Sequence, residues 1–169
     1  MQQQLMFENK PEKLILSITG HRPNRLGGYK ESVFSELILF AIVQIQKIKP
    51  TEVNIGMALG WDQAVAKACI ACGIPYHAHV VRAQQSIWNS WQKGRYEELM
   101  SLAVSKTYHG DANSEGYMAR NRAMVDSGNS ILALWDGSTD SGTSATVRYA
   151  KSKDKHIINC WEDWQRWLQ

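Results

Sequence analysis

Apolar residues follow two patterns that alternate along the chain: short continuous runs, and longer stretches in which they recur every three or four positions. The short runs predict strands over residues 13–19, 52–57, 75–81, 103–109, 130–135 and 156–160. The helical spacing predicts helices over residues 29–49, 62–72, 92–102, 115–127, 143–152 and 161–168. Because strands that alternate with helices are typical of βαβ units, we predict an α/β fold: a Rossmann-like domain with a mainly parallel sheet of about six strands and helices on both faces.

Residues at the ends of these segments support the assignment. The first predicted strand, KLILSIT, is a continuous apolar run, as in a strand that helices cover on both faces. Pro50 and Gly73 follow the first two predicted helices at positions where such residues stop a helix. The last predicted helix carries four large apolar side chains on one face: Trp161, Trp164, Trp167 and Leu168. This pattern predicts a terminal helix that docks through an aromatic stripe.

Composition and charge narrow the class of protein. The chain has 169 residues, 44% of them hydrophobic and 21% charged, which is typical of one globular domain. We take residues 1–169 as that domain, with a flexible N-terminal segment over 1–12 and a loop over 82–90. The formal net charge of +3 comes without a basic cluster, so we do not expect a nucleic-acid partner. The longest apolar run, residues 37–43, is far shorter than the ~20 residues of a membrane span, and the polar N-terminus lacks a secretory signal. These features predict a cytoplasmic protein with no membrane partner.

The three cysteines leave two interpretations, of which we favour packing. Cys69, Cys72 and Cys160 are an odd number in a chain long enough to fold without disulfides, so we expect them to be reduced. Cys69 and Cys72 form a C-x-x-C motif, with His77 and His79 close behind, so a zinc site is the alternative. However, both cysteines fall on the apolar stripe of a predicted helix, where small side chains pack in a core. We therefore expect neither a metal nor a cofactor.

Glycines and polar residues gather directly after four of the six predicted strands. These segments are residues 19–22 (TGHR), 56–62 (GMALGWD), 109–111 (HGD) and 136–143 (DGSTDSGT). In an open parallel sheet, ligands bind beyond the carboxyl ends of the strands, close to the point where the strand order reverses. The loops therefore predict a ligand site at that edge of the sheet.

The segment 136–143 has the features of a phosphate site. A loop of small residues that opens a helix presents unpaired N–H groups and the positive end of the helix dipole. The residues that we assign to this site are Asp136, Gly137, Ser138, Gly142, Thr143 and Ser144. The alternative is that Asp140 or Ser141 only caps the helix. The loop lacks the G-K-[ST] ending of a P-loop, and no G-x-G-x-x-G follows the first strand, so common NTPase and dinucleotide-dehydrogenase functions are not supported.

Two other strand ends supply candidate acids and cations. Gly56 and Gly60 surround the end of the second strand, and Asp62 lies in the first turn of the next helix, where it suits a ribose hydroxyl or a catalytic role. Capping of that helix is the alternative for this carboxylate. After Gly20, His21 offers a titratable ring, and Arg22, which we prefer, offers a bidentate binder of anions.

A predicted helix before the fifth strand carries a further basic group. Arg120, Asn121 and Arg122 lie on it, and Arg120 shares a face with Met124 one turn later. The usual alternative for two arginines on a helix is a solvated surface.

The motifs T-G-H-R-P, G-M-A-L-G-W-D, R-N-R-A-M and D-G-S-T-D-S-G-T, in this order, resemble the SLOG superfamily over residues 14–160. Within it the chain is most similar to the YpsA/YspA-like branch, which is related to the LOG phosphoribohydrolases and to DprA. The resemblance implies a Rossmann-like sheet whose glycine loops hold a nucleotide or a nucleotide-derived ligand.

LOG-type members hydrolyse the N-glycosidic bond of nucleoside monophosphates with an arginine and a glutamate. Arg120 and Met124 match the arginine motif, with Asn121 in place of its lysine, and Gly142 and Thr143 match the loop that carries the glutamate. The glutamate position itself is Thr146, which lacks the carboxylate that stabilises an oxocarbenium-like transition state. Another acid would be needed, and of the two at strand ends, Asp62 and Asp136, we prefer Asp62.

Three hypotheses follow. The first is a domain that binds a nucleotide or nucleoside-phosphate ligand, with Asp62 and Arg120 as candidate catalytic residues for hydrolysis of its N-glycosidic bond. The second is a non-catalytic sensor or sequestering protein for a nucleotide-derived signal, which the lost glutamate favours. The third is binding of single-stranded DNA, for which the candidate set is Arg82, Trp88, Trp91, Lys93 and Arg95. The aromatic-rich region around Trp88 and Trp91 is also a candidate interface for a homo-oligomer, the form in which relatives often occur.

Overall fold

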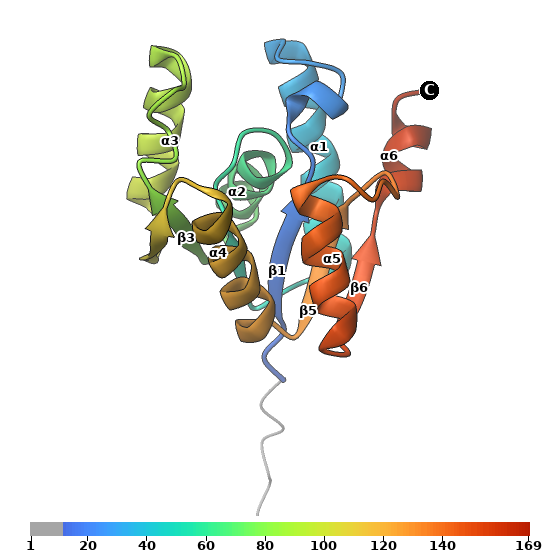
Figure 1. Cartoon of the computed structure of the whole chain (residues 1–169). Coiled ribbons are helices and arrows are strands. Elements are labelled where there is room, and N and C mark those ends of the chain that lie inside the picture. Colours follow the sequence, from blue (N-terminus) through green and yellow to red (C-terminus); the bar gives the residue numbers. More distant parts are fainter. Residues whose placement is uncertain (1–11) are drawn as a thin grey trace, which may run out of the picture.

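The computed structural model describes residues 12–169, so the flexible segment predicted over residues 1–12 lies outside the described residues, apart from Glu12. The strands are β1 (Ile15–Gly20), β2 (Glu52–Ile55), β3 (Tyr76–Arg82), β4 (Ser105–Asp111), β5 (Ser130–Leu134) and β6 (His156–Asn159). The α-helices are α1 (Glu31–Ile48), α2 (Trp61–Cys72), α3 (Ser90–Leu102), α4 (Ser114–Ser127), α5 (Gly142–Ser152) and α6 (Trp161–Trp167) (Figure 1). All twelve predicted elements are thus confirmed, and the structure adds a short 3-10 helix, η1 (Pro23–Arg25).

The six strands form one sheet in the order β4-β3-β2-β1-β5-β6, and every neighbouring pair is parallel. The chain first builds outward from β1 to β4, then returns to the other side of β1 to add β5 and β6. The strand order therefore reverses between β1 and β5, where Ser17 pairs with Ile131 and Gly20 with Leu134. At such a reversal the loops that leave the two strands diverge and open a crevice between them.

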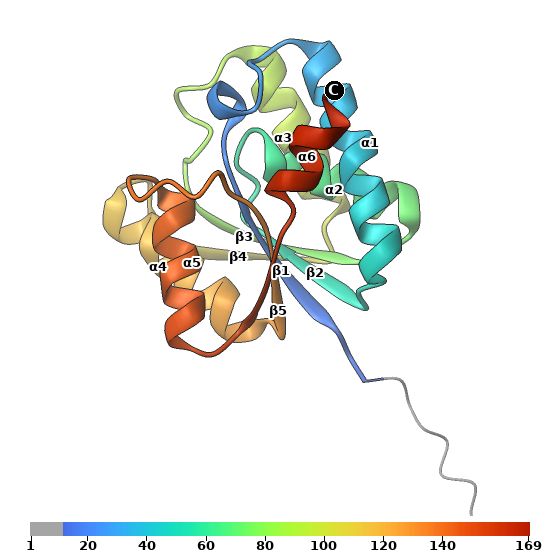
Figure 2. The ribbon, with the colours of Figure 1, turned by 90° about the vertical axis from the view of Figure 1, so that its right-hand side faces the viewer.

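Helices cover both faces of the sheet, as predicted. Figure 2 shows α4 and α5 on one side of the strands and α1, α2, α3 and α6 on the other. The larger core lies under α1 and α2 and includes the fully buried Phe40, Trp61 and Trp164. A smaller cluster of Val125, Ile131 and Ala150 holds α4 and α5 against the opposite face.

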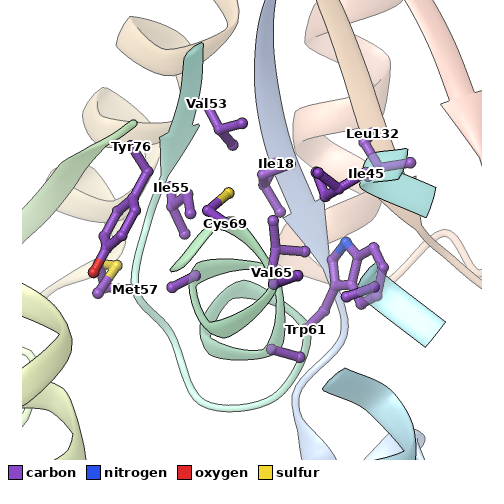
Figure 3. Close-up of a cluster of buried hydrophobic side chains, with 14 of the residues drawn as sticks. Ile18, Ile45, Val53, Ile55, Met57, Trp61, Val65, Cys69, Tyr76 and Leu132 are labelled. Carbon is purple, nitrogen blue, oxygen red and sulfur yellow. The ribbon is translucent and has the colours of Figure 1, made fainter. Parts of the chain in front are cut away.

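Helix α2 packs its small side chains directly on the strands. In Figure 3, Val65 and Cys69 of this helix lie among Ile18, Val53 and Ile55 of the sheet. Cys69 is fully buried, which confirms the packing interpretation of the C-x-x-C motif. Burial in this apolar setting raises the pKa of Cys69 to about 12, so the thiol is held in its protonated form.

The aromatic stripe of the last helix is confirmed in part. Trp164 is buried, with its ring 5.2 Å from that of Phe40 on α1, and Trp161 contacts the ring of His21 edge-on at 5.8 Å. Leu168, by contrast, comes after the end of the helix and is 54% exposed. Within residues 12–169 no helix combines the length and the apolar character needed to cross a bilayer.

Candidate functional site

A pocket of about 370 Å³ lies beyond the carboxyl ends of the strands, at the reversal between β1 and β5. Four segments line it: the end of β1 with η1, the β2–α2 loop, one face of α4 and the beginning of α5. The predicted site residues that line the pocket are Gly20, His21, Arg22, Asp62, Arg120, Asn121, Gly142 and Thr143. The structure therefore brings together residues separated by more than a hundred positions in the sequence.

Arg120 lines the pocket as a largely buried side chain and does not lie on a solvated surface. Arg120 is 6% exposed. Its guanidinium donates through Nη1 to the Gly56 carbonyl at 2.8 Å and through Nε to Asn121 Oδ1 at 2.7 Å. Among residues 12–169 no partner is present for Nη2, which remains available to a ligand. Burial lowers the pKa of Arg120, and the nearby Asp62 carboxylate acts in the opposite direction.

Asp62 is the acidic residue that lines the pocket, and it does not cap α2. The N-cap position belongs to Gly60, while Asp62 Oδ2 accepts a hydrogen bond from the Ala58 N–H at 3.2 Å. Burial of the carboxyl group raises the pKa of Asp62 to about 6, although Arg120, the Ala58 amide and Arg22 favour its charged form. A carboxyl group with this pKa is able both to hold and to release a proton near neutral pH.

The backbone at the end of β2 makes room for this pair. A Cβ on Gly56 would lie 2.7 Å from Arg120 Nη1 and 3.0 Å from Asp62 Oδ2, so only glycine lets both groups cross the strand end. Met57 follows with a φ of 62°, and the buried side chain of Gln63 donates to its carbonyl at 3.2 Å. Gln84 donates to the Gly56 carbonyl at 3.2 Å. Neither glutamine was expected from the sequence, because buried amides on an apolar helix and loop carry no pattern of their own.

The segment after β1 is tied to the segment after β5. The His21 side chain is only 2% exposed, and its Nε2 lies 2.9 Å from Asp136 Oδ1. Arg25 extends the link, since its Nη1 donates to Ser138 Oγ at 2.8 Å and its Nη2 to Asp140 Oδ1 at 3.2 Å. Partial burial acts to raise the pKa of Asp136, but hydrogen bonds from Ser138 and His21 hold that pKa well below its ordinary value.

The beginning of α5 is both capped and open to the pocket. Ser141 is the N-cap, and it forms a capping box with Ser144, in which each side chain accepts a hydrogen bond from the backbone of the other. Gly142 and Thr143 line the pocket, and their N–H groups have no partner among the residues that the structure describes. These two amides and the helix dipole suit an anion.

Several residues assigned to the phosphate site lie elsewhere. Asp136, Gly137 and Ser138 belong to the loop that binds Arg25 and His21, outside the lining of the pocket. Ser144 is 1% exposed, and its hydroxyl donates to the Ser141 carbonyl at 2.6 Å. Gly56 and Gly60 act through backbone geometry, since Gly60 has a φ of 95° and its Cβ would lie 2.8 Å from the His21 carbonyl oxygen.

The pocket also contains residues that the sequence analysis does not assign to the site. These are Ile18, Thr19, Asn24, Arg25, Ala58, Tyr117 and Ser141. Tyr117 was detectable in principle, because it precedes Arg120 by three positions and so shares its helical face. Asn24 and Arg25 arrive on η1, a single turn too short to leave a periodic pattern.

Thr146, which occupies the position of the LOG glutamate, does not reach the pocket. It is 2% exposed, and its hydroxyl donates to the Gly142 carbonyl at 2.9 Å within α5. Asp62 is therefore the carboxylate that the fold offers to a ligand in this pocket.

The set proposed for single-stranded DNA is largely engaged with the protein itself. Arg95 binds both carboxylate oxygens of Glu31 at 2.8 Å and lies over the ring of Phe34, with its Cζ 4.0 Å from the ring centroid. Trp88 packs edge-on against Tyr96 with 5.5 Å between ring centroids. An arginine neutralised in this way contributes little to a phosphate-binding groove.

Comparison with models of known protein families finds no match. The sequence is 30% identical to the uncharacterised SPbeta prophage-derived protein YoqJ of Bacillus subtilis strain 168, over 57% of this chain and 67% of that protein.

Solved structures share the fold at low sequence identity. DNA processing protein A (DprA) from Streptococcus pneumoniae has a TM-score of 0.60 and 13% identity over 86% of this chain, which spans 49% of that protein. The structural-genomics target TM1055 has a TM-score of 0.58 and 13% identity over 86% of this chain and 72% of its own. DprA from Helicobacter pylori, described for its binding of single-stranded DNA, has a TM-score of 0.60 and 16% identity over 85% of this chain and 63% of its own. These similarities show that the chain shares the fold of the two DprA proteins and TM1055.

Proposed function

We propose that the chain, which belongs to the same family as YoqJ and shares the fold of DprA, binds a nucleotide or a nucleoside-phosphate-derived ligand in the pocket between β1 and β5. Within the superfamily we assign it to the YpsA/YspA-like branch, on the motifs T-G-H-R-P and G-M-A-L-G-W-D.

One observation carries the proposal: a buried carboxyl group and a buried guanidinium meet at the end of β2, beside the open amides of α5. Asp62 and Arg120 are each 6% exposed, and both lie against the same glycine, Gly56. The N–H groups of Gly142 and Thr143, together with Arg22, offer an anion-binding subsite in the same pocket. Phosphate at α5 would leave the sugar near Asp62, the arrangement that a nucleoside phosphate requires.

The reaction that we assign to this site is hydrolysis of the N-glycosidic bond. Water attacks the anomeric carbon, the carbon–nitrogen bond breaks, and its electron pair stays with the departing base. Asp62 in its ionised form takes the proton from water, and the base then acquires a proton from the resulting carboxylic acid. A pKa of about 6 suits this exchange, because neither form of Asp62 is strongly disfavoured near neutral pH.

Binding without turnover is the second candidate, and Thr146 is the observation that favours it. Glycosidases of this chemistry ordinarily use two carboxylates, whereas Asp62 is the acid that lines this pocket and Thr146 is bound within α5. A sensor or a sequestering protein needs the anion-binding subsite but no second acid. We place single-stranded DNA behind both candidates, because Arg95 is already paired with Glu31.

The deciding experiment incubates the purified chain with a mixture of nucleoside monophosphates, deoxynucleotides and ADP-ribose, and follows released base and retained ligand by mass spectrometry. Release of a base by the wild-type chain, and its loss in Asp62→Asn with ligand still retained, would establish the glycosidase. Retention of one intact compound without release would establish the binding protein. The control is Asp154→Asn, which removes a carboxylate from the exposed turn after α5. If the wild-type chain neither releases a base nor retains a compound, the proposed function is wrong.

A further inference from the structure

The aromatic ring of Tyr117 lines the pocket, and neither the phosphate nor the sugar of the proposed ligand accounts for its presence there. We propose that Tyr117 is the platform on which the base of the ligand stacks, and that Asn24 and Asn121 contact the edge of that base. This inference rests on the proposed function and deepens it: the pocket would distinguish a base-bearing nucleotide from a base-free sugar phosphate.

The placement of Tyr117 follows from the geometry of α4. Tyr117, Arg120, Asn121 and Met124 all line the pocket, and their spacing of three, four and seven positions puts them on one face of the helix. Tyr117 lies in the first turn of α4, at the end of the helix near the carboxyl ends of the strands, whereas Met124 is 2% exposed. The ring therefore stands at the opening and Met124 at depth.

Tyr117 is the aromatic side chain that a ligand in this pocket can reach. The other ring that lines it belongs to His21, whose side chain is 2% exposed and bound to Asp136. Tyr117 is only half-buried. Stacking of bases on exposed tyrosine rings is a general mode of nucleotide recognition that tolerates any base.

Two guanidinium groups lie over the ring of Tyr117. The Cζ atoms of Arg22 and Arg120 lie 5.9 and 5.4 Å from the centroid of the Tyr117 ring. Guanidinium planes also stack on bases. Arg22 is exposed, and no carboxylate lies within ion-pair distance of it in the described part of the chain, so it is free to shift against an arriving base.

Amide groups flank the ring and suit the polar edge of a base. Asn121 Oδ1 accepts a hydrogen bond from Arg120 Nε at 2.7 Å, which leaves the Nδ2 donor of Asn121 for a ligand. Asn24 lines the pocket from η1 with an exposed side chain. Together they offer donors and an acceptor for hydrogen bonds to a planar heterocycle.

A structural role for Tyr117 makes a different prediction. If the ring served only to hold Arg120 by a cation–π contact, its loss would weaken every phosphate-bearing ligand equally. If the ring stacks on the base, its loss would weaken nucleotides and spare sugar phosphates.

The test measures the affinities of the whole chain for the four ribonucleoside 5′-monophosphates, ribose 5-phosphate and inorganic phosphate by calorimetry. The wild-type chain should bind at least one nucleotide more tightly than ribose 5-phosphate. Tyr117→Leu should weaken that nucleotide by roughly 5- to 150-fold, the range of one stacking contact, and leave ribose 5-phosphate within about twofold. Tyr117→Phe keeps the ring and should retain the affinity for the nucleotide, which guards against a Leu variant that fails to fold.

Three results would overturn the inference. Equal wild-type affinity for ribose 5-phosphate and for every nucleotide would remove the base subsite while the phosphate site stands. An equal loss of both ligand types in Tyr117→Leu would reduce the ring to a support for Arg120. Binding of none of the probes would reject the proposed function together with the base subsite.

Discussion

Asp62 gives the pocket a titratable group whose effect on stability has a definite sign. The folded pKa of about 6 lies above the ordinary value of 3.8, so the folded chain holds this proton more tightly than the unfolded chain. The stability that protonated Asp62 contributes is therefore complete below about pH 4 and is lost as the pH rises through 6. The upward shift corresponds to about 3 kcal/mol at alkaline pH.

Asp62→Asn removes this titration and should change the pH profile of stability. We expect the free energy of unfolding of the variant, minus that of the wild-type chain, to rise by up to about 3 kcal/mol between about pH 4 and pH 8. Urea denaturation across this range measures the difference, and any constant offset from the loss of charge beside Arg120 cancels. A difference that stays flat with pH would mean that Asp62 is not buried as the structure has it.

We expect Asp140 to compete with a bound phosphate for a cation at the pocket. Its carboxylate is 74% exposed and lies 3.2 Å from Arg25 Nη2, and Arg25 itself lines the pocket. Asp140→Asn should free part of that positive charge and tighten the binding of inorganic phosphate by roughly two- to fivefold, the range of an exposed ion pair. Asp154→Asn, at the opposite end of α5, controls for the change in net charge. A loss of affinity would instead show that Asp140 positions Arg25 for the ligand.

The first turn of α5 contains both the cap and the amides that we propose bind an anion, and substitutions at the N-cap separate the two. Ser141→Ala removes the capping hydrogen bond to the Ser144 N–H and should cost about 1 kcal/mol of stability. Ser141→Asp keeps a capping oxygen, so stability should be retained, but it places a negative charge at the opening of the pocket. We expect this variant to lose phosphate binding, as calorimetry would show. Undiminished binding by a stable Ser141→Asp chain would place the phosphate away from α5.

The elements themselves could be predicted from the sequence because each has a local cause. Continuous apolar runs mark strands covered on both faces, and Gly73 at a φ of 68° ends α2 where a stop was expected. The sequence does not predict the turn η1, because three residues show no period. For the same reason it does not predict the role of Arg25. The sequence offers Ser144 as a hydroxyl donor to a phosphate, whereas in the structure the capping box with Ser141 uses its hydroxyl.

At the scale of the whole molecule, the strand order decides where these residues meet. The reversal between β1 and β5 brings Arg22, Asp62 and Gly142 to one crevice, although no local pattern states which strands are neighbours. The loops after the strands predict a ligand site at the same edge of the sheet where the pocket lies. Which residues at that edge line the pocket depends on side-chain contacts that join segments far apart in the sequence, such as the contact between His21 and Asp136.

Helix α6 contacts both the larger core and the residues beside this crevice, and substitutions can test the two contacts separately. Trp164 is 1% exposed and packs on Phe40, whereas Trp161 touches the ring of His21 beside the pocket. Since removal of a buried indole leaves a large cavity, Trp164→Ala should lower the free energy of unfolding by about 3–5 kcal/mol.

Trp167→Ala is the matched control, because that indole is 38% exposed and lies 5.7 Å from Phe40 at the edge of the same cluster. It should cost about 1 kcal/mol. Because neither residue lines the pocket, both variants should keep the wild-type affinity for inorganic phosphate at a temperature where they remain folded. Loss of that affinity in folded Trp164→Ala would show that α6 holds the crevice in shape through Trp161 and His21, and the core and the site would then act as one unit.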